Sequence, residues 1–193
     1  MGRVAEKIFL LESAWAGLEE GAPESVFLRV EAWGDAGRER ADSGPFAERL
    51  CRMYRSWAER RRMQMTVVEA AVPGSSFRST LALAGFGCGW LLAHEVGLHV
   101  LEAPGEDGNV RRLVARVSLA SQPETPAPRE ALAMQAAALL AAAVSAPTVV
   151  RRYRETPSPL VRDAVKGWRT GLLDRVLDGD FDLLARAVAP AAV

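Results

Sequence analysis

The sequence predicts an α+β fold in which helices pack on an antiparallel or mixed sheet. One observation is the pattern after Pro45, where apolar residues recur at three- and four-residue steps and indicate an amphipathic helix. A second is the change to a strand-like pattern in residues 63–70 directly afterwards. A third is a series of short apolar runs separated by glycine and proline turns, which is typical of a sheet.

Composition bounds the class of protein. The 193 residues are 49% hydrophobic and 25% charged, which is enough to bury one core. The net charge is zero, so no bulk attraction to nucleic acid or membrane is expected, although the helix after Pro45 is locally basic. Cys51 and Cys88 form no CxxC pair and are expected to be reduced thiols. No apolar run is long and uncharged enough to span a bilayer, so we expect a cytoplasmic protein.

The elements follow in order along the chain. The predicted helices span residues 4–20, 45–62 and 130–144, with two short helices broken at residues 178–180. The first carries Ile8, Leu11, Trp15 and Leu18 on one side and is expected to be a packing helix. Ser43 is expected to cap the second after a polar loop over residues 34–44. The predicted strands span residues 25–32, 63–70, 77–84, 90–94, 98–101 and 110–119, arranged as a meander, and a returning strand spans 148–154.

Two patterns look like ligand sites but fail on spacing. Gly85, Gly87 and Gly89 lack the third spacing of a phosphate-binding loop and precede no predicted helix, so they indicate a turn. His94 and His99 are five residues apart in strand-like sequence, which does not suit two metal ligands on one helix face. We therefore expect no metal and no cofactor.

Three arginines form a small basic cluster. Arg111, Arg112 and Arg116 lie in the predicted strand 110–119 and could bind phosphate. The alternative is that they line a solvated sheet face, which is the more common role of such charges.

Several segments together resemble a known family. They are Arg52-Met-Tyr-Arg-Ser-Trp-Ala-Glu-Arg60, Gly89-Trp-Leu, Gly97-Leu-His99, Pro104, Leu160-Val-Arg-Asp163 and Val176-Leu-Asp-Gly-Asp180. In this order they resemble class I peptide chain release factors, nearest the bacterial UGA-reading kind. The resemblance implies a codon-recognition domain fused directly to a C-terminal domain. Its parts would be a residual N-terminal helix in residues 1–22, a central-domain-like region in 23–120, a linker in 121–129, and further helices and a returning strand on the same core in 130–193.

The departures from the family concern its catalytic domain. In the family, a domain carrying Gly-Gly-Gln lies between the strand that matches residues 110–119 and the helix that matches 130–144. Here residues 120–129 fill that interval, and the sequence contains no Gly-Gly pair. Most of the family's N-terminal helical domain is also missing. The resemblance therefore implies a protein that is not an enzyme and has no catalytic residues.

The codon-reading segment is also changed. The family's Ser-Pro-Phe corresponds to Ala103-Pro104-Gly105, which lacks both the hydroxyl and the aromatic ring. The resemblance implies a regulator of translation that binds the ribosome or rRNA without hydrolysing peptidyl-tRNA. Its RNA contacts would be Arg111, Arg112, Arg116 and His99. The alternative is a protein-interaction module in a non-ribosomal complex.

Overall fold

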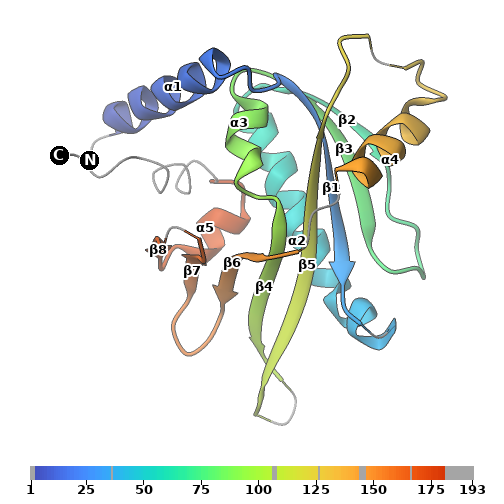
Figure 1. The fold of residues 1–193 in the computed structure, drawn as a ribbon. Coiled ribbons are helices and arrows are strands. Elements are labelled where there is room, and N and C mark those ends of the chain that lie inside the picture. Colours follow the sequence, from blue (N-terminus) through green and yellow to red (C-terminus); the bar gives the residue numbers. More distant parts are fainter. Residues whose placement is uncertain are drawn as a thin grey trace.

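The chain folds as an eight-stranded mixed sheet with helices on both faces (Figure 1). The computed structural model describes residues 3–35, 37–105, 108–125, 127–143, 147–165 and 167–180. The elements in chain order are α1 (Arg3–Glu19), β1 (Ser25–Trp33), α2 (Gly37–Arg60), β2 (Gln64–Glu69), β3 (Arg78–Ala84), α3 (Cys88–Ala93), β4 (Gly97–Pro104), β5 (Val110–Ser121), α4 (Leu132–Ala142), β6 (Val149–Arg154), β7 (Leu160–Asp163), β8 (Arg169–Thr170) and α5 (Leu173–Leu177). The predicted α+β class with a mixed sheet is confirmed.

The strand order differs from the predicted meander. It is β2-β3-β1-β5-β4-β6-β7-β8, and every neighbouring pair is antiparallel except β4 and β6, which are parallel. β1 therefore lies inside the sheet, between β3 and β5. It suits this place because both of its faces are apolar: Leu28 and Val30 face α2, whereas Phe27 packs against α4 on the other side.

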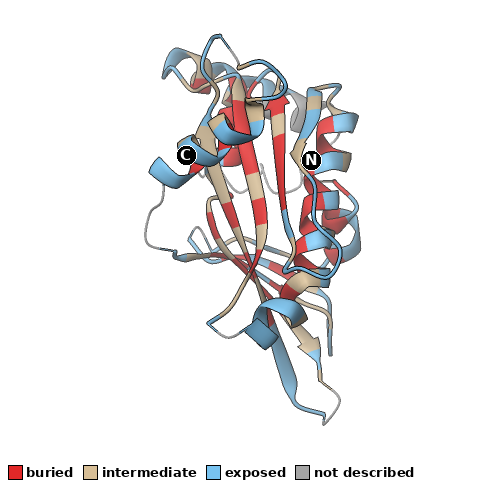
Figure 2. Ribbon diagram, turned by 90° about the vertical axis from the view of Figure 1, so that its right-hand side faces the viewer, coloured by how far each residue is buried: buried red, intermediate tan, exposed pale blue. Residues whose placement is uncertain are grey.

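α2 covers the middle of one face of the sheet, which we call the inner face. Five large side chains of the helix are at most 2% exposed: Phe46, Leu50, Met53, Tyr54 and Trp57. They are the apolar stripe that the sequence predicts. Burying a side chain of this size stabilises the fold by about 1.5–3 kcal/mol. Figure 2 shows that the buried residues lie where strands and helices meet.

α2 begins earlier than its sequence suggests. The helix starts at Gly37, so the predicted loop over residues 34–44 is wrong for most of its length. Pro45 lies inside the helix, where it removes one backbone donor. Ser43 does not cap the helix, because its buried hydroxyl accepts a hydrogen bond of 3.0 Å from the Val114 N–H of β5. Contact with the sheet therefore outweighs the local helix-breaking signal.

α3 replaces a predicted strand. Residues 90–94 were expected in the sheet, but Cys88–Ala93 form a short helix instead. A run this short does not distinguish the apolar periodicity of a helix from that of a strand. The prediction of a turn at the preceding glycines is correct, since Gly87 has the left-handed φ of 72°.

α1 packs on α3 through its small residues. A Cβ on Gly17 would lie 2.6 Å from the Trp90 ring, and a Cβ on Gly87 would lie 2.5 Å from the Ala14 side chain. The large side chains that were expected to pack face outward instead. Ile8, Leu11 and Trp15 are 50%, 58% and 61% exposed.

The segment between β5 and α4 is short and mostly exposed. Gln122 anchors its start, because the side-chain amide donates to the Val26 carbonyl at 2.8 Å. Pro123, Glu124 and Thr125 are exposed. α4 then covers Phe27 on the sheet face opposite α2, the outer face, and β6 joins the same sheet beside β4. The second predicted C-terminal helix lies outside the described residues.

Both cysteines lie inside the protein. Cys51 and Cys88 are buried free thiols, as predicted, and burial raises the pKa of the Cys88 thiol to about 12. Within the described residues, no helix has both the length and the apolar character needed to cross a bilayer.

We expect a protease that cleaves after glutamate to cut the chain early at Glu124. The peptide bond is accessible there, whereas β5 is paired within the sheet and α4 packs on Phe27. Mass spectrometry after brief digestion, followed by gel filtration, should show two fragments that remain associated. Glu124→Gln is the matched control and should remove this cut. Separation of the fragments, or resistance of the parent at this site, would contradict the prediction.

Candidate functional site

The β4–β5 hairpin carries most of the residues that the sequence singles out. It extends well beyond the strands beside it, toward the bottom of Figure 1. Ala103 is paired with Arg111, and Pro104 is paired with Val110. The Gly105 N–H donates to the Asn109 carbonyl at 2.7 Å, which closes the end of the hairpin. The Ala103-Pro104-Gly105 segment and Arg111 are therefore brought together at one projecting end of the sheet.

The three predicted arginines do not share one face. Leu113 and Val117 of β5 are buried on the inner face, so strand alternation places Arg112 and Arg116 on the outer face and Arg111 on the inner one. The expectation of a single three-arginine face is wrong for this reason. Arg111 and Arg112 are exposed and form no hydrogen bond or ion pair within the described part of the chain. Arg116 lies over the Trp33 ring at 4.9 Å from its centroid, a cation–π contact.

His99 lies inside the protein and cannot contact RNA. Its side chain is 0% exposed, so the prediction of an RNA contact is wrong. Alternation along β4 turns His99 inward, on the same face as Leu101.

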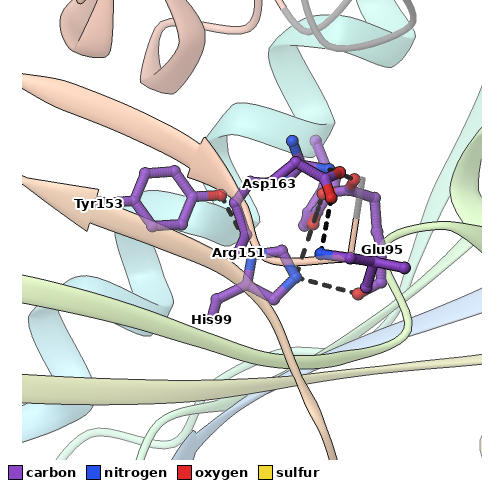
Figure 3. Close-up of polar contacts among 7 residues, drawn as sticks. Glu95, His99, Arg151, Tyr153 and Asp163 are labelled. Carbon is purple, nitrogen blue, oxygen red and sulfur yellow. Dashed lines mark hydrogen bonds and ion pairs between the residues drawn. The ribbon is translucent and has the colours of Figure 1, made fainter. Parts of the chain in front are cut away.

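His99 belongs to a buried polar network (Figure 3). The network joins α2, the turn after α3, β4, β6 and β7. Its members are Tyr54, Glu95, His99, Arg151, Tyr153 and Asp163. Sequence reasoning missed all of them except His99. The available signal was a set of charged residues within apolar strands, but their convergence depends on the pairing of β4, β6 and β7.

Glu95 is the centre of this network. Its carboxylate accepts a hydrogen bond of 3.0 Å from the Tyr54 hydroxyl and another from the Arg151 guanidinium. Arg151 also lies 3.7 Å from the Asp163 carboxylate. Burial raises the pKa of the Glu95 carboxyl, and the positive charge of Arg151 opposes that rise.

The hydrogen bonds of His99 define its tautomer. Nε2 lies 2.9 Å from the Glu95 carbonyl oxygen, which can only accept, so Nε2 carries the hydrogen. Nδ1 must then accept from the Tyr153 hydroxyl, 3.1 Å away. Burial, reinforced by the nearby Arg151 charge, lowers the pKa of the imidazole to about 3. The ring is therefore neutral at physiological pH.

The network links several helices and strands inside the protein. Its side chains are at most 9% exposed, and each bond joins groups on different elements. Losing one partner of such a buried ion pair costs about 3–5 kcal/mol, because the other charge is left uncompensated. Within the described residues, Arg151 Nε and Nη1 have no hydrogen-bond partner, so the desolvation of this side chain is only partly offset. No group of three or more potential metal ligands occurs in the described part of the chain.

We expect acid to destabilise the protein partly through His99. The folded pKa of about 3 is below the ordinary 6.5, so the unfolded chain binds more protons between these values. The stabilisation is complete above pH 6.5 and is lost as the pH falls from 6.5 toward 3, by up to about 1.4 kcal/mol per pH unit.

Urea unfolding of the parent and His99→Gln over this range measures the effect. Glutamine keeps one donor and one acceptor but does not titrate, and Glu95 is common to both proteins. The parent should therefore lose stability more steeply on acidification than the variant. Equal slopes would contradict the buried neutral imidazole.

Comparison with known proteins adds information on the fold. The chain matches no known family profile and no curated protein sequence. Its structure is similar to that of RF2 of Thermus thermophilus, with a TM-score of 0.65 and 18% sequence identity. The match covers 94% of this chain and 74% of that one. The protein therefore has a release-factor-like fold.

Proposed function

We propose that this protein is a non-catalytic relative of class I release factors that binds the ribosome or rRNA and regulates translation. The observation that carries the proposal is the release-factor-like fold combined with a direct connection from β5 to α4. Residues 122–131 form this connection, in the interval where the family that the sequence resembles has its catalytic domain.

The same interval argues against peptide release. The chain contains no Gly-Gly pair that could present a backbone amide as the Gly-Gly-Gln segment of the family does. The buried polar network is closed to solvent, so it offers no open site for a reaction. Occupancy of the ribosome without hydrolysis would make the protein an antagonist or regulator.

Codon discrimination is not part of the proposal. The sequence most resembles the UGA-reading kind, but Ala103 and Gly105 provide neither a hydroxyl nor a ring to read a base. The hairpin end does provide exposed cations, Arg111 and Arg112. Contacts between arginine and phosphate give affinity without sequence information. The proposed binding is therefore independent of the codon.

A second candidate function is a protein-interaction module. It is favoured by the exposed apolar side of α1, formed by Ile8, Leu11 and Trp15. Contiguous apolar surface of this kind often marks a protein interface. This candidate becomes the better one if the protein does not bind ribosomes.

Purified protein should not release peptide from ribosomal termination complexes at any stop codon. The reason is the missing Gly-Gly-Gln segment. Release of labelled peptide is measured at each stop codon, with an active release factor as the positive control. Release above the spontaneous rate that depends on the stop codon would contradict the non-catalytic assignment.

Binding to small ribosomal subunits should weaken steeply with salt. Each phosphate contact contributes about 0.7 to the slope of log affinity against log salt. Replacing Arg111 and Arg112 by alanine should therefore flatten the slope by about 1.4. Co-sedimentation across a salt series measures this for the parent and the variant.

The matched control replaces Arg38 and Arg129 by alanine, since both are exposed and neither belongs to β4 or β5. It should keep the parent slope. Binding that is indifferent to Arg111 and Arg112 would exclude the hairpin site. Absence of co-sedimentation even at low salt would favour the protein-interaction function.

A further inference from the structure

Three arginines stand side by side across the last three strands of the sheet. Arg152 of β6 is directly opposite Arg162 of β7, which is directly opposite Arg169 of β8. All three are exposed. Their strand neighbours Tyr153 and Val161 are fully buried on the inner face, so the arginines point to the outer face. We call these three residues the arginine row.

The row brings like charges together without local compensation. Neighbouring strands are about 4.8 Å apart, and like charges directly opposite each other destabilise a sheet. None of the three side chains forms a hydrogen bond or ion pair with any residue that the structure describes. By contrast, Arg29 on the same face is paired with Glu69 at 3.4 Å. The row therefore destabilises the fold, and binding of an anionic partner would explain why the three arginines are placed together.

The arginine row lies on an open part of the outer face. α4 covers this face around Phe27. Figure 1 shows that α4 lies toward one end of the strand order and that β6–β8 lie toward the other end. A basic surface continues from the row toward the hairpin. In the next line of residues across the strands, Arg154 of β6 and Arg112 of β5 lie on either side of Glu102 of β4. Cations thus lie on β8, β7, β6 and β5, with Glu102 of β4 between the last two strands.

We propose that the arginine row binds the phosphate backbone of an RNA strand. The guanidinium group matches phosphate geometry with paired N–H donors. An extended polymer with a charge on every unit can contact all three arginines at once, whereas a small anion reaches fewer of them on a flat sheet face. This proposal rests on the proposed association with ribosomes or rRNA and adds contacts on β6, β7 and β8 to those at the end of the hairpin.

The test is fluorescence anisotropy with a short labelled single-stranded RNA across a salt series, together with co-sedimentation with small subunits. The variant replaces Arg152, Arg162 and Arg169 by serine. If each arginine contacts one phosphate, the salt slope should fall by about 2. At low salt, affinity should drop at least tenfold. Replacement of all three by lysine should restore part of the binding, because the charge remains but the paired donors are lost.

A matched control carries the same loss of charge elsewhere. Arg38→Ser, Arg55→Ser and Arg129→Ser remove three exposed arginines outside the row. This control should bind RNA like the parent. The melting temperature of the arginine-row serine variant should equal or exceed that of the parent at low salt, because repulsion within the row is relieved. That result separates lost binding from unfolding.

The outcomes separate this inference from the proposed function. If the parent binds subunits and RNA but the arginine-row variant binds equally well, the inference is wrong and the proposed function stands. If the parent binds neither, the proposed function fails as well. If polyglutamate displaces the RNA as effectively as unlabelled RNA of equal charge, the row is a general acidic-partner site and the phosphate assignment is wrong.

Discussion

Burial of one side of α2 against the inner face of the sheet is the interaction on which the rest of the structure depends. The helix crosses β1 and β5, and its side chains from Phe46 to Trp57 exclude water from the middle of the sheet. This contact also extends the helix to Gly37, past a proline that would otherwise mark its start. The sheet edge at β2 and the C-terminal strands are arranged around this shared core, and a smaller apolar cluster around Phe27 lies under α4 on the other face.

The buried network attaches the C-terminal strands to that core. The segment from Gln122 to α4 runs outside the core, so it cannot hold β6–β8 in place by itself. Parallel pairing of β4 with β6 and the Glu95–Arg151 pair make the attachment. Burying this network costs desolvation free energy. It also specifies the strand register, because a shifted register would leave a buried charge unpaired. This specificity is a physical reason why β6 pairs with β4 although the segment that connects β5 to α4 runs outside the core.

The same arrangement separates the two faces of the sheet. The inner face is filled by α2 and the buried network, whereas α4 covers the outer face around Phe27. Cations gather on the part that stays open, and Arg116 is held there against Trp33. A neutral chain can therefore present a basic surface, because net charge does not describe how charges are distributed over the faces of a sheet.

The sequence by itself determined the α+β class, the apolar stripe of α2 and most strands, because these depend on local periodicity. It also predicted the short connection between β5 and α4, because residues 120–129 are rich in proline and carry no apolar periodicity. Tertiary structure alone decided that Cys88–Ala93 are helical, that His99 is buried, and that Arg111 and Arg112 face opposite ways. It also decided the arginine row. These features depend on which strands pair and in which register, and pairing between residues distant in sequence is set by burial of the whole sheet rather than by any local pattern.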